Sequence, residues 1–222
     1  VRAAVLEGVG ATWAAATTTV DVTAEMAAQV VFTLFGLAVL GLRLGHDSIV
    51  AKQALAGVAM TAAAIVAFAV LQRRGVSNVG ALIERFAPGV GSHFADTSAL
   101  IGAIHARPGR LALAVLLHLL AWIASALGAW LALAVGGVAV GAADIIGLEA
   151  LIMAVRSAAF LAPMGIGVQE ASYALLGPLF GLGPELAVAL SFIKRARELI
   201  VGGPVLALWQ VREGRRLLAA GR

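Results

Sequence analysis

Long apolar stretches, separated by short polar or glycine-rich turns, run through most of the chain. Each stretch is about as long as the 20 or so residues that an α-helix needs to cross the hydrocarbon core of a bilayer. The pattern therefore predicts an all-α fold, a polytopic integral membrane helical bundle. The predicted long helices cover residues 20–44, 49–71, 111–135, 142–161 and 185–211.

The most unusual interruption of this pattern is the stretch PMGIGVQE at residues 163–170. Pro163 lacks an amide proton, and Gly165 and Gly167 permit backbone angles that other residues resist, so a helix should break here. The helical segment that follows, about residues 170–181, reaches roughly 18 Å, against about 30 Å of hydrocarbon. Because unpaired backbone groups are costly in lipid, a broken helix at membrane depth must be covered by protein or a wet cavity. We therefore predict a re-entrant broken-helix segment, the alternative being a plain surface loop between two spans.

Polar residues recur at every fourth position in the first predicted span, at Asp21, Glu25 and Gln29. Residues four apart differ by only about 40° around a helix, so these side chains share one narrow face. Carboxylates are expensive in hydrocarbon and normally face a bundle interior or a cavity. We predict that this face meets protein or water. The alternative is that Asp21 and Glu25 lie at head-group level and only favour the start of the helix.

The last predicted helix carries a run of charges about two to three turns from its start, which places them near the bilayer midplane. A solitary cation there is costly, so each one needs acidic or anionic company. Counted with the charges of the neighbouring segments, four cations face three acids, and one positive charge remains. This excess suits an anion or phosphate better than a cation, the alternative being an internal ion-pair cluster that holds the bundle together. The charges counted are Glu149, Arg156, Glu170, Lys194, Arg195, Arg197 and Glu198.

The composition supports a membrane protein, because 61% of the 222 residues are hydrophobic and only 13% are charged. Soluble domains carry about 25% charged residues. The sequence pI of about 10.6 comes from arginine-rich turns, which topology explains without a nucleic-acid partner. The chain has no cysteine, and its four histidines show no paired ligand spacing, so we expect no metal site and no cofactor.

Arginine-rich turns also predict the orientation of the chain. The positive-inside rule places Arg73, Arg107 and Arg216 in the cytoplasm, with the C-terminus, and the turns near Gly45 and Gly137 outside. Residues 77–107 mix apolar and charged positions around a proline and glycines, which predicts an amphipathic connector on the cytoplasmic face. Because the chain opens within an alanine-rich segment, we expect residues 1–222 to form a single transmembrane domain of an N-terminally truncated fragment.

The stretch at residues 163–170 resembles the Pro-Gly-Gly-Leu-Gly-x-x-Glu motif in the membrane domain of lysylphosphatidylglycerol synthases and their flippase-like relatives, with Met164 in place of the first glycine. Residues 19–23 with Gln29, and residues 192–199, resemble the hopanoid-biosynthesis-associated membrane protein of that superfamily. The resemblance implies lipid translocation or export in a bacterial inner membrane. Its implied partners are membrane lipids with a polar or anionic head group, a hopanoid being one candidate.

Three functions fit these patterns. The first is a flippase-like transporter that accepts a lipid head group while the tails stay in the bilayer; this function is favoured, and it is not an enzymatic one. The second is a membrane-embedded transferase with Asp21 or Glu25 as a base or metal ligand, although the acids lack the paired spacing of diphosphate sites. The third is a scaffold for lipid-synthesis enzymes that docks through residues 77–105. The predicted substrate-binding residues are Asp21, Glu25, Gln29, Arg156, Pro163, Gly165, Gly167, Glu170, Lys194, Arg195, Arg197 and Glu198.

Overall fold

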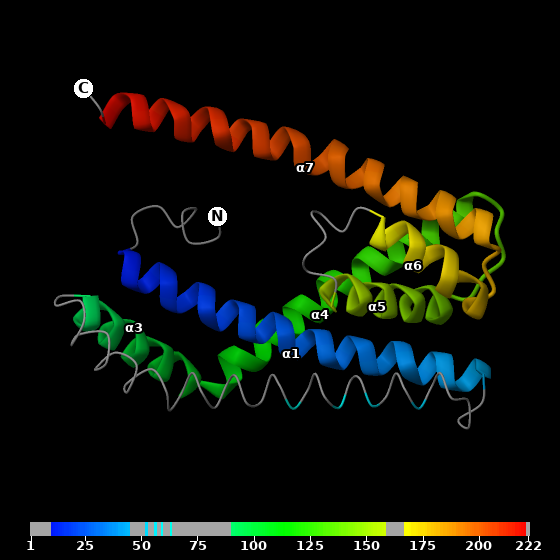
Figure 1. Ribbon diagram of the computed structural model, residues 1–222, viewed down its shortest axis with the longest axis horizontal. Coiled ribbons are helices and arrows are strands. Elements are labelled where there is room, and N and C mark those ends of the chain that lie inside the picture. The colour runs from blue at the N-terminus through cyan, green and yellow to red at the C-terminus, as the bar shows by residue number, and fades with distance from the viewer. Residues whose placement is uncertain are drawn as a thin grey trace.

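The computed structural model describes residues 10–44, 90–158 and 167–220, together with Lys52, Ala56, Ala59 and Ala63. In these parts of the chain every regular element is a helix and no strand occurs, so the predicted all-α fold is confirmed. The elements are α1 (Ala11–Leu44), α3 (Val90–His105), α4 (Pro108–Val135), α5 (Ala142–Ala158), α6 (Val168–Leu176), the 3-10 helix η3 (Gly177–Phe180) and α7 (Pro184–Ala220). Figure 1 shows the short helices α5 and α6 lying between the long helices α1 and α7.

Two of the described helices, α1 and α4, are long and apolar enough to cross a bilayer. Helix α4 covers the predicted span 111–135 and leaves most of its apolar surface exposed. In water, such an exposed apolar surface would promote association between protein molecules, whereas in a membrane it faces lipid. The exposed leucines on the first half of α4 are Leu113, Leu116, Leu117 and Leu120. The two helices thus support the prediction of a membrane bundle.

The long helices extend further than the hydrophobic pattern predicted. Helix α1 begins at Ala11 because its threonines do not interrupt it: the hydroxyls of Thr17 and Thr19 donate to backbone carbonyls four residues earlier, each at 2.8 Å. Helix α7 runs past the predicted end at residue 211 to Ala220, although it contains Pro204. Pro204 therefore does not end the helix.

The short segment predicted after the motif is confirmed. Helix α6 has only nine residues, and η3 continues it to Phe180 before the chain turns into α7. Pro163 and Gly165, which are the predicted cause of the break, lie outside the described residues. The depth of the segment in the membrane therefore stays a prediction.

The second predicted span, residues 49–71, and the first part of the predicted connector also lie largely outside the described residues. The last part of the connector forms α3, which packs along α1. Ile101 of α3 is buried against Ala16 and Val20 of α1. Helix α3 therefore packs against α1 through an apolar face, which an amphipathic connector requires.

The main core lies where α1, α5, η3 and α7 meet, and it depends on two glycines. A Cβ atom on Gly36 of α1 would lie 2.8 Å from the carbonyl oxygen of Gly147 on α5. A Cβ on Gly147 would lie 3.0 Å from the ring of Phe180. Small residues at a crossing let the helix backbones approach closely, which is how membrane helices gain packing energy. This crossing fixes α5, which carries two charged residues of the candidate site.

An ion pair ties the end of α1 to the start of α5. Arg43 donates to Asp144 through two nitrogens, with an Nε–Oδ1 distance of 2.6 Å and an Nη2–Oδ2 distance of 2.5 Å. Asp144 lies in the first turn of α5, where a carboxylate also stabilises the helix dipole. Because Asp144 neutralises it, Arg43 can lie near the turn that is predicted to be outside.

Candidate functional site

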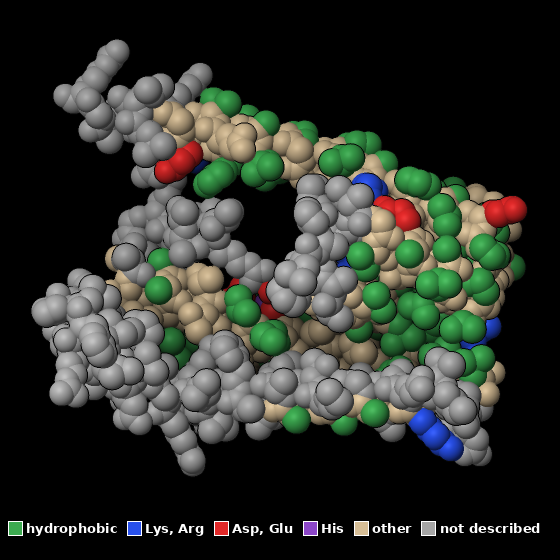
Figure 2. Space-filling model, in the orientation of Figure 1, with side chains coloured by type: hydrophobic (Ala, Val, Ile, Leu, Met, Phe, Trp, Pro, Cys, Tyr) green, Lys and Arg blue, Asp and Glu red, His purple; other side chains and the backbone are tan. Residues whose placement is uncertain are grey.

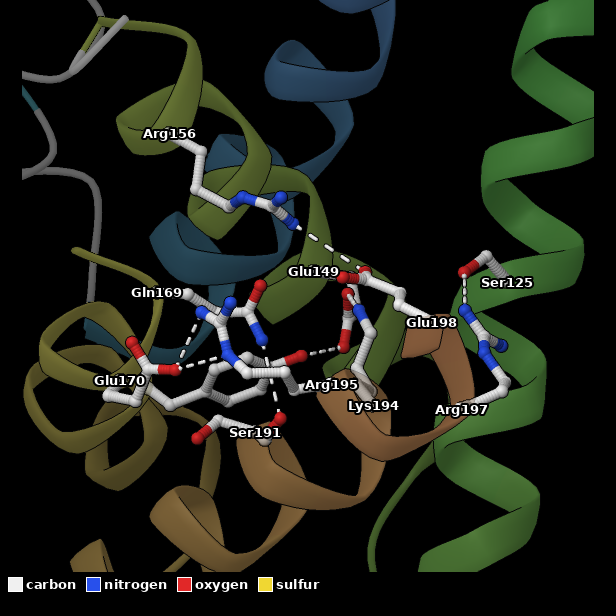
Figure 3. Close-up of polar contacts among 11 residues, drawn as sticks. Ser125, Glu149, Arg156, Gln169, Glu170, Ser191, Lys194, Arg195, Arg197 and Glu198 are labelled. Carbon is white, nitrogen blue, oxygen red and sulfur yellow. Dashed lines mark hydrogen bonds and ion pairs between the residues drawn. The ribbon is translucent and has the colours of Figure 1, made fainter. Parts of the chain in front are cut away.

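The most deeply buried charges of the described residues are Lys194 on α7 and Glu149 on α5, whose side chains are 10% and 9% exposed. They form an ion pair, and the hydroxyl of Tyr173 on α6 donates to the other oxygen of Glu149. The Lys194 ammonium also lies 5.7 Å from the centre of the Tyr173 ring. Three helices thus meet around one neutralised carboxylate (Figure 3). The geometry gives Lys194 a structural partner, which the sequence analysis did not assign.

Glu170, the last residue of the motif, uses both of its carboxylate oxygens. One accepts the backbone N–H of Gly167 at 2.8 Å, which caps the start of α6. The other accepts the Nε–H of Arg195 on α7, also at 2.8 Å. Gly167 has a φ of +81°, in the left-handed region that favours glycine, so the motif requires glycine here. The prediction that the cations of the last helix need acidic partners is thus confirmed for Arg195, whose partner is Glu170.

Gln169 is a site residue that the sequence analysis did not single out. Its side chain is 1% exposed, and its Nε2 donates to the backbone oxygen of Ser191 on α7 at 3.3 Å. Among the described residues, its Oε1 has no hydrogen-bond partner. A glutamine one position before the motif glutamate gives no signal of burial, since its partner is a backbone atom of a distant helix.

Arg156 and Glu198 form the loosest pair of the cluster. Arg156 Nη1 lies 3.9 Å from Glu198 Oε1, and the two side chains are 35% and 43% exposed. Arg156 of α5 thus takes its partner from another helix, because Glu198 belongs to α7. The distance is at the outer limit of an ion pair, so this contact holds Glu198 far less firmly than Glu149 and Glu170 are held.

Arg197 is exposed, and no carboxylate of the described residues lies within ion-pair distance of it. Its guanidinium rests on α4, where Nη2 donates to Ser125 Oγ at 3.0 Å. One turn along α4, a Cβ on Gly128 would lie 3.5 Å from Nη1, an ordinary contact distance, so the guanidinium lies directly against this turn of the helix. Ser125 and Gly128 carry no signal in the sequence, since they belong to an otherwise apolar span. Figure 3 shows Glu198 between Arg156 and Arg197.

The polar face of α1 meets protein, as predicted. Asp21 Oδ1 lies 3.1 Å from His118 Nε2 of α4, so His118 is a helix-to-helix partner. Gln29, about 12 Å further along α1 at 1.5 Å per residue, accepts from Ser157 Oγ of α5 at 3.5 Å. Glu25 lies between them and is part-buried. Because Ser157 follows Arg156, the far end of this face adjoins the charged cluster.

The structure therefore gathers most of the predicted site residues between α5, α6 and α7, with Gln29 of α1 beside them. Asp21 lies apart from them, in its own pair with α4. Within the described parts of the chain, no group of three or more His, Asp or Glu side chains is placed to hold a metal ion. The residues brought together are Arg156, Gly167, Glu170, Lys194, Arg195, Arg197 and Glu198.

A cluster of charges held between apolar helices is typical of membrane proteins that handle polar groups inside the bilayer. The chain belongs to the family described as the lysylphosphatidylglycerol synthase TM region, whose family model matches residues 1–205. No curated protein and no solved structure shows significant similarity to it. The superfamily part of the resemblance is thereby confirmed. The protein is a membrane protein tied to lipid metabolism or transport.

Proposed function

We propose that the protein translocates a lipid with a polar or anionic head group between the leaflets of the bacterial inner membrane. The observation that carries the proposal is Arg197, an exposed guanidinium with a neutral protein partner, Ser125. An arginine in a membrane requires a partner or water, because a bare charge in hydrocarbon is costly. A lipid head group supplies that partner, and guanidinium is well suited to phosphate or carboxylate oxygens.

The surroundings of Arg197 suit a lipid that keeps its tails in the bilayer. Beyond the charged run, α7 exposes apolar side chains, and α4 also exposes apolar side chains on both sides of Ser125 in the sequence, such as Leu120 and Leu127. Figure 2 shows basic and acidic side chains next to each other within the mostly hydrophobic surface around the middle of α7. The exposed apolar residues that follow on α7 include Leu199, Ile200, Val201 and Val205. A lipid head group can thus contact the charged side chains while its acyl chains stay against the neighbouring apolar side chains, in the bilayer.

Two other functions are supported less well by the described residues. A transferase was expected to use Asp21 or Glu25, but Asp21 lies 3.1 Å from His118 of α4, apart from the charged cluster, and the described residues hold no group of acids placed for a metal ion. A scaffold for lipid-synthesis enzymes would use the connector, whose described part, α3, buries Ile101 against α1. The likeness to the hopanoid-associated branch makes a hopanoid lipid one candidate substrate.

Replacing Arg197 with glutamine tests the proposal. In proteoliposomes with labelled lipids, leaflet exchange should fall at least about tenfold, since a charge-assisted hydrogen bond contributes roughly 1.5–3 kcal/mol. The protein should remain folded, because the residue is exposed and forms no ion pair within the described residues. Arg107→Gln is the matched control, because Arg107 is an exposed arginine at the start of α4 whose side chain makes no capping hydrogen bond. Equal exchange by both variants and the wild type would refute the proposal.

The orientation that the arginines predict can be tested directly. Cysteines introduced at positions 107 and 137 can be labelled individually, because the chain has no cysteine of its own. In intact cells, an impermeant thiol reagent should label position 137, in the turn after α4, and leave position 107 unlabelled. Labelling of position 107 from outside would show that the proposed orientation is wrong.

A further inference from the structure

The charged cluster of α5, α6 and α7 comprises four cations and three acids, Glu149, Arg156, Glu170, Lys194, Arg195, Arg197 and Glu198. Glu149 is neutralised by Lys194, and Glu170 by Arg195, both at short range and largely buried. These two ion pairs are each neutral, so they present no net charge to a ligand. What remains is Arg156, Glu198 and Arg197, on the exposed side of the cluster, with two cations and one acid.

We propose that Glu198 is a specificity residue that tunes this site for lipids carrying one net negative charge. The inference rests on the proposed lipid site, and it names the class of lipid: a phosphodiester whose head group is otherwise neutral. With such a lipid bound at Arg197, the two arginines and the two anions sum to zero, which is the favoured state in a medium of low dielectric constant.

The position of Glu198 suits this role. Its carboxylate is held only by Arg156, at 3.9 Å, and lies between Arg156 and Arg197 (Figure 3). It can therefore remain with Arg156 while the lipid phosphate takes Arg197 and Ser125. Without Glu198 the site would present two positive charges and would prefer a phosphomonoester, whose charge at pH 7 is about −1.5 to −2.

The other lipid charges fit less well. A zwitterionic lipid adds no net charge, so the site would keep its single excess positive charge. A phosphomonoester would add a second negative charge next to Glu198, and like charges at short range repel each other. The order of preference should thus be phosphodiester monoanion first, with the zwitterion and the phosphomonoester each about tenfold weaker.

Binding of lipids to the purified full chain in detergent micelles tests this inference without any leaflet exchange. The probe is a fluorescent phosphatidylglycerol, displaced by phosphatidylglycerol, phosphatidylethanolamine or phosphatidic acid with identical acyl chains. The wild type should prefer phosphatidylglycerol. Glu198→Gln should reverse the order so that phosphatidic acid displaces the probe best, about tenfold better than phosphatidylglycerol. An unchanged order in Glu198→Gln would overturn the inference.

The double variant Arg156→Gln with Glu198→Gln provides the matched control, because it removes one charge of each sign and restores the net charge. It should regain the wild-type order, whereas Arg156→Gln alone, with no net charge at the site, should lose its preference for anionic lipids. Failure of the double variant to restore the wild-type order of lipids would overturn the inference. This comparison also applies if Glu198→Gln alone does not fold, because the double variant is measured against the wild type. If the lipid order is as expected but leaflet exchange is absent, the translocation proposal fails and the assignment of Glu198 stands.

Discussion

Replacing Glu149 with glutamine should cause a large loss of stability. The change would leave the Lys194 ammonium with no counter-ion at a position that is 10% exposed. Removing one partner of a buried ion pair typically costs about 3–5 kcal/mol. The measurement is the fraction of purified protein that stays monodisperse in detergent after heating. This fraction should fall at a clearly lower temperature for Glu149→Gln than for the wild type.

Two comparisons separate the buried charge from other effects of the substitution. Glu185→Gln, at the exposed start of α7, removes a carboxylate without uncovering a cation and should leave the thermal transition nearly unchanged. Combining Glu149→Gln with Lys194→Met removes the stranded charge and should recover much of the lost stability. Equal behaviour of Glu149→Gln and Glu185→Gln would show that this pair does not stabilise the bundle.

Several features of the site could be predicted from the sequence because their causes are local. The short helix after residue 163 follows from the spacing of proline and glycine, and the positive φ of Gly167 is what a motif glycine predicts. The shared face of Asp21 and Gln29 follows from helical periodicity, and both residues do contact neighbouring helices. The need of each cation for an acidic partner followed from its cost in a membrane, which left Glu149, Glu170 and Glu198 as candidate partners.

The choice between such candidates could not be predicted, because it depends on how the helices are rotated and placed. Glu149 and Lys194 are separated by 45 positions, and Arg43 and Asp144 by 101, and no local pattern connects them. Tyr173 gives no signal of its role, because a tyrosine in an apolar helix is ordinary. The support of Arg197 by Ser125 depends on the packing of α4 against α7, which hydrophobic periodicity does not specify.

The assignment of Glu170 to Arg195 gives the last prediction, which separates structural arginines from the proposed ligand-binding one. Arg195→Gln should destabilise the protein, since its partner's side chain is only 22% exposed and would lose its counter-ion. Arg197→Gln, two positions away, should leave the thermal transition near that of the wild type while it stops lipid exchange. The two variants remove the same side chain from the same helix, so they control for each other.

Substitutions of Glu170 test the same assignment from the other side. Glu170→Gln loses the charge but keeps an oxygen for the N–H of Gly167. Glu170→Ala loses both contacts and should lower the stability by about 0.5–2 kcal/mol more. In the Arg195→Gln background, Glu170→Gln should lower the stability much less than it does in the wild type, because the ion pair is already broken. In the Arg197→Gln background, Glu170→Gln should lower the stability as much as it does in the wild type, and it should not restore lipid exchange. If instead Glu170→Gln restores lipid exchange to Arg197→Gln, the two residues act as a pair, and the head-group site must lie elsewhere in the bundle.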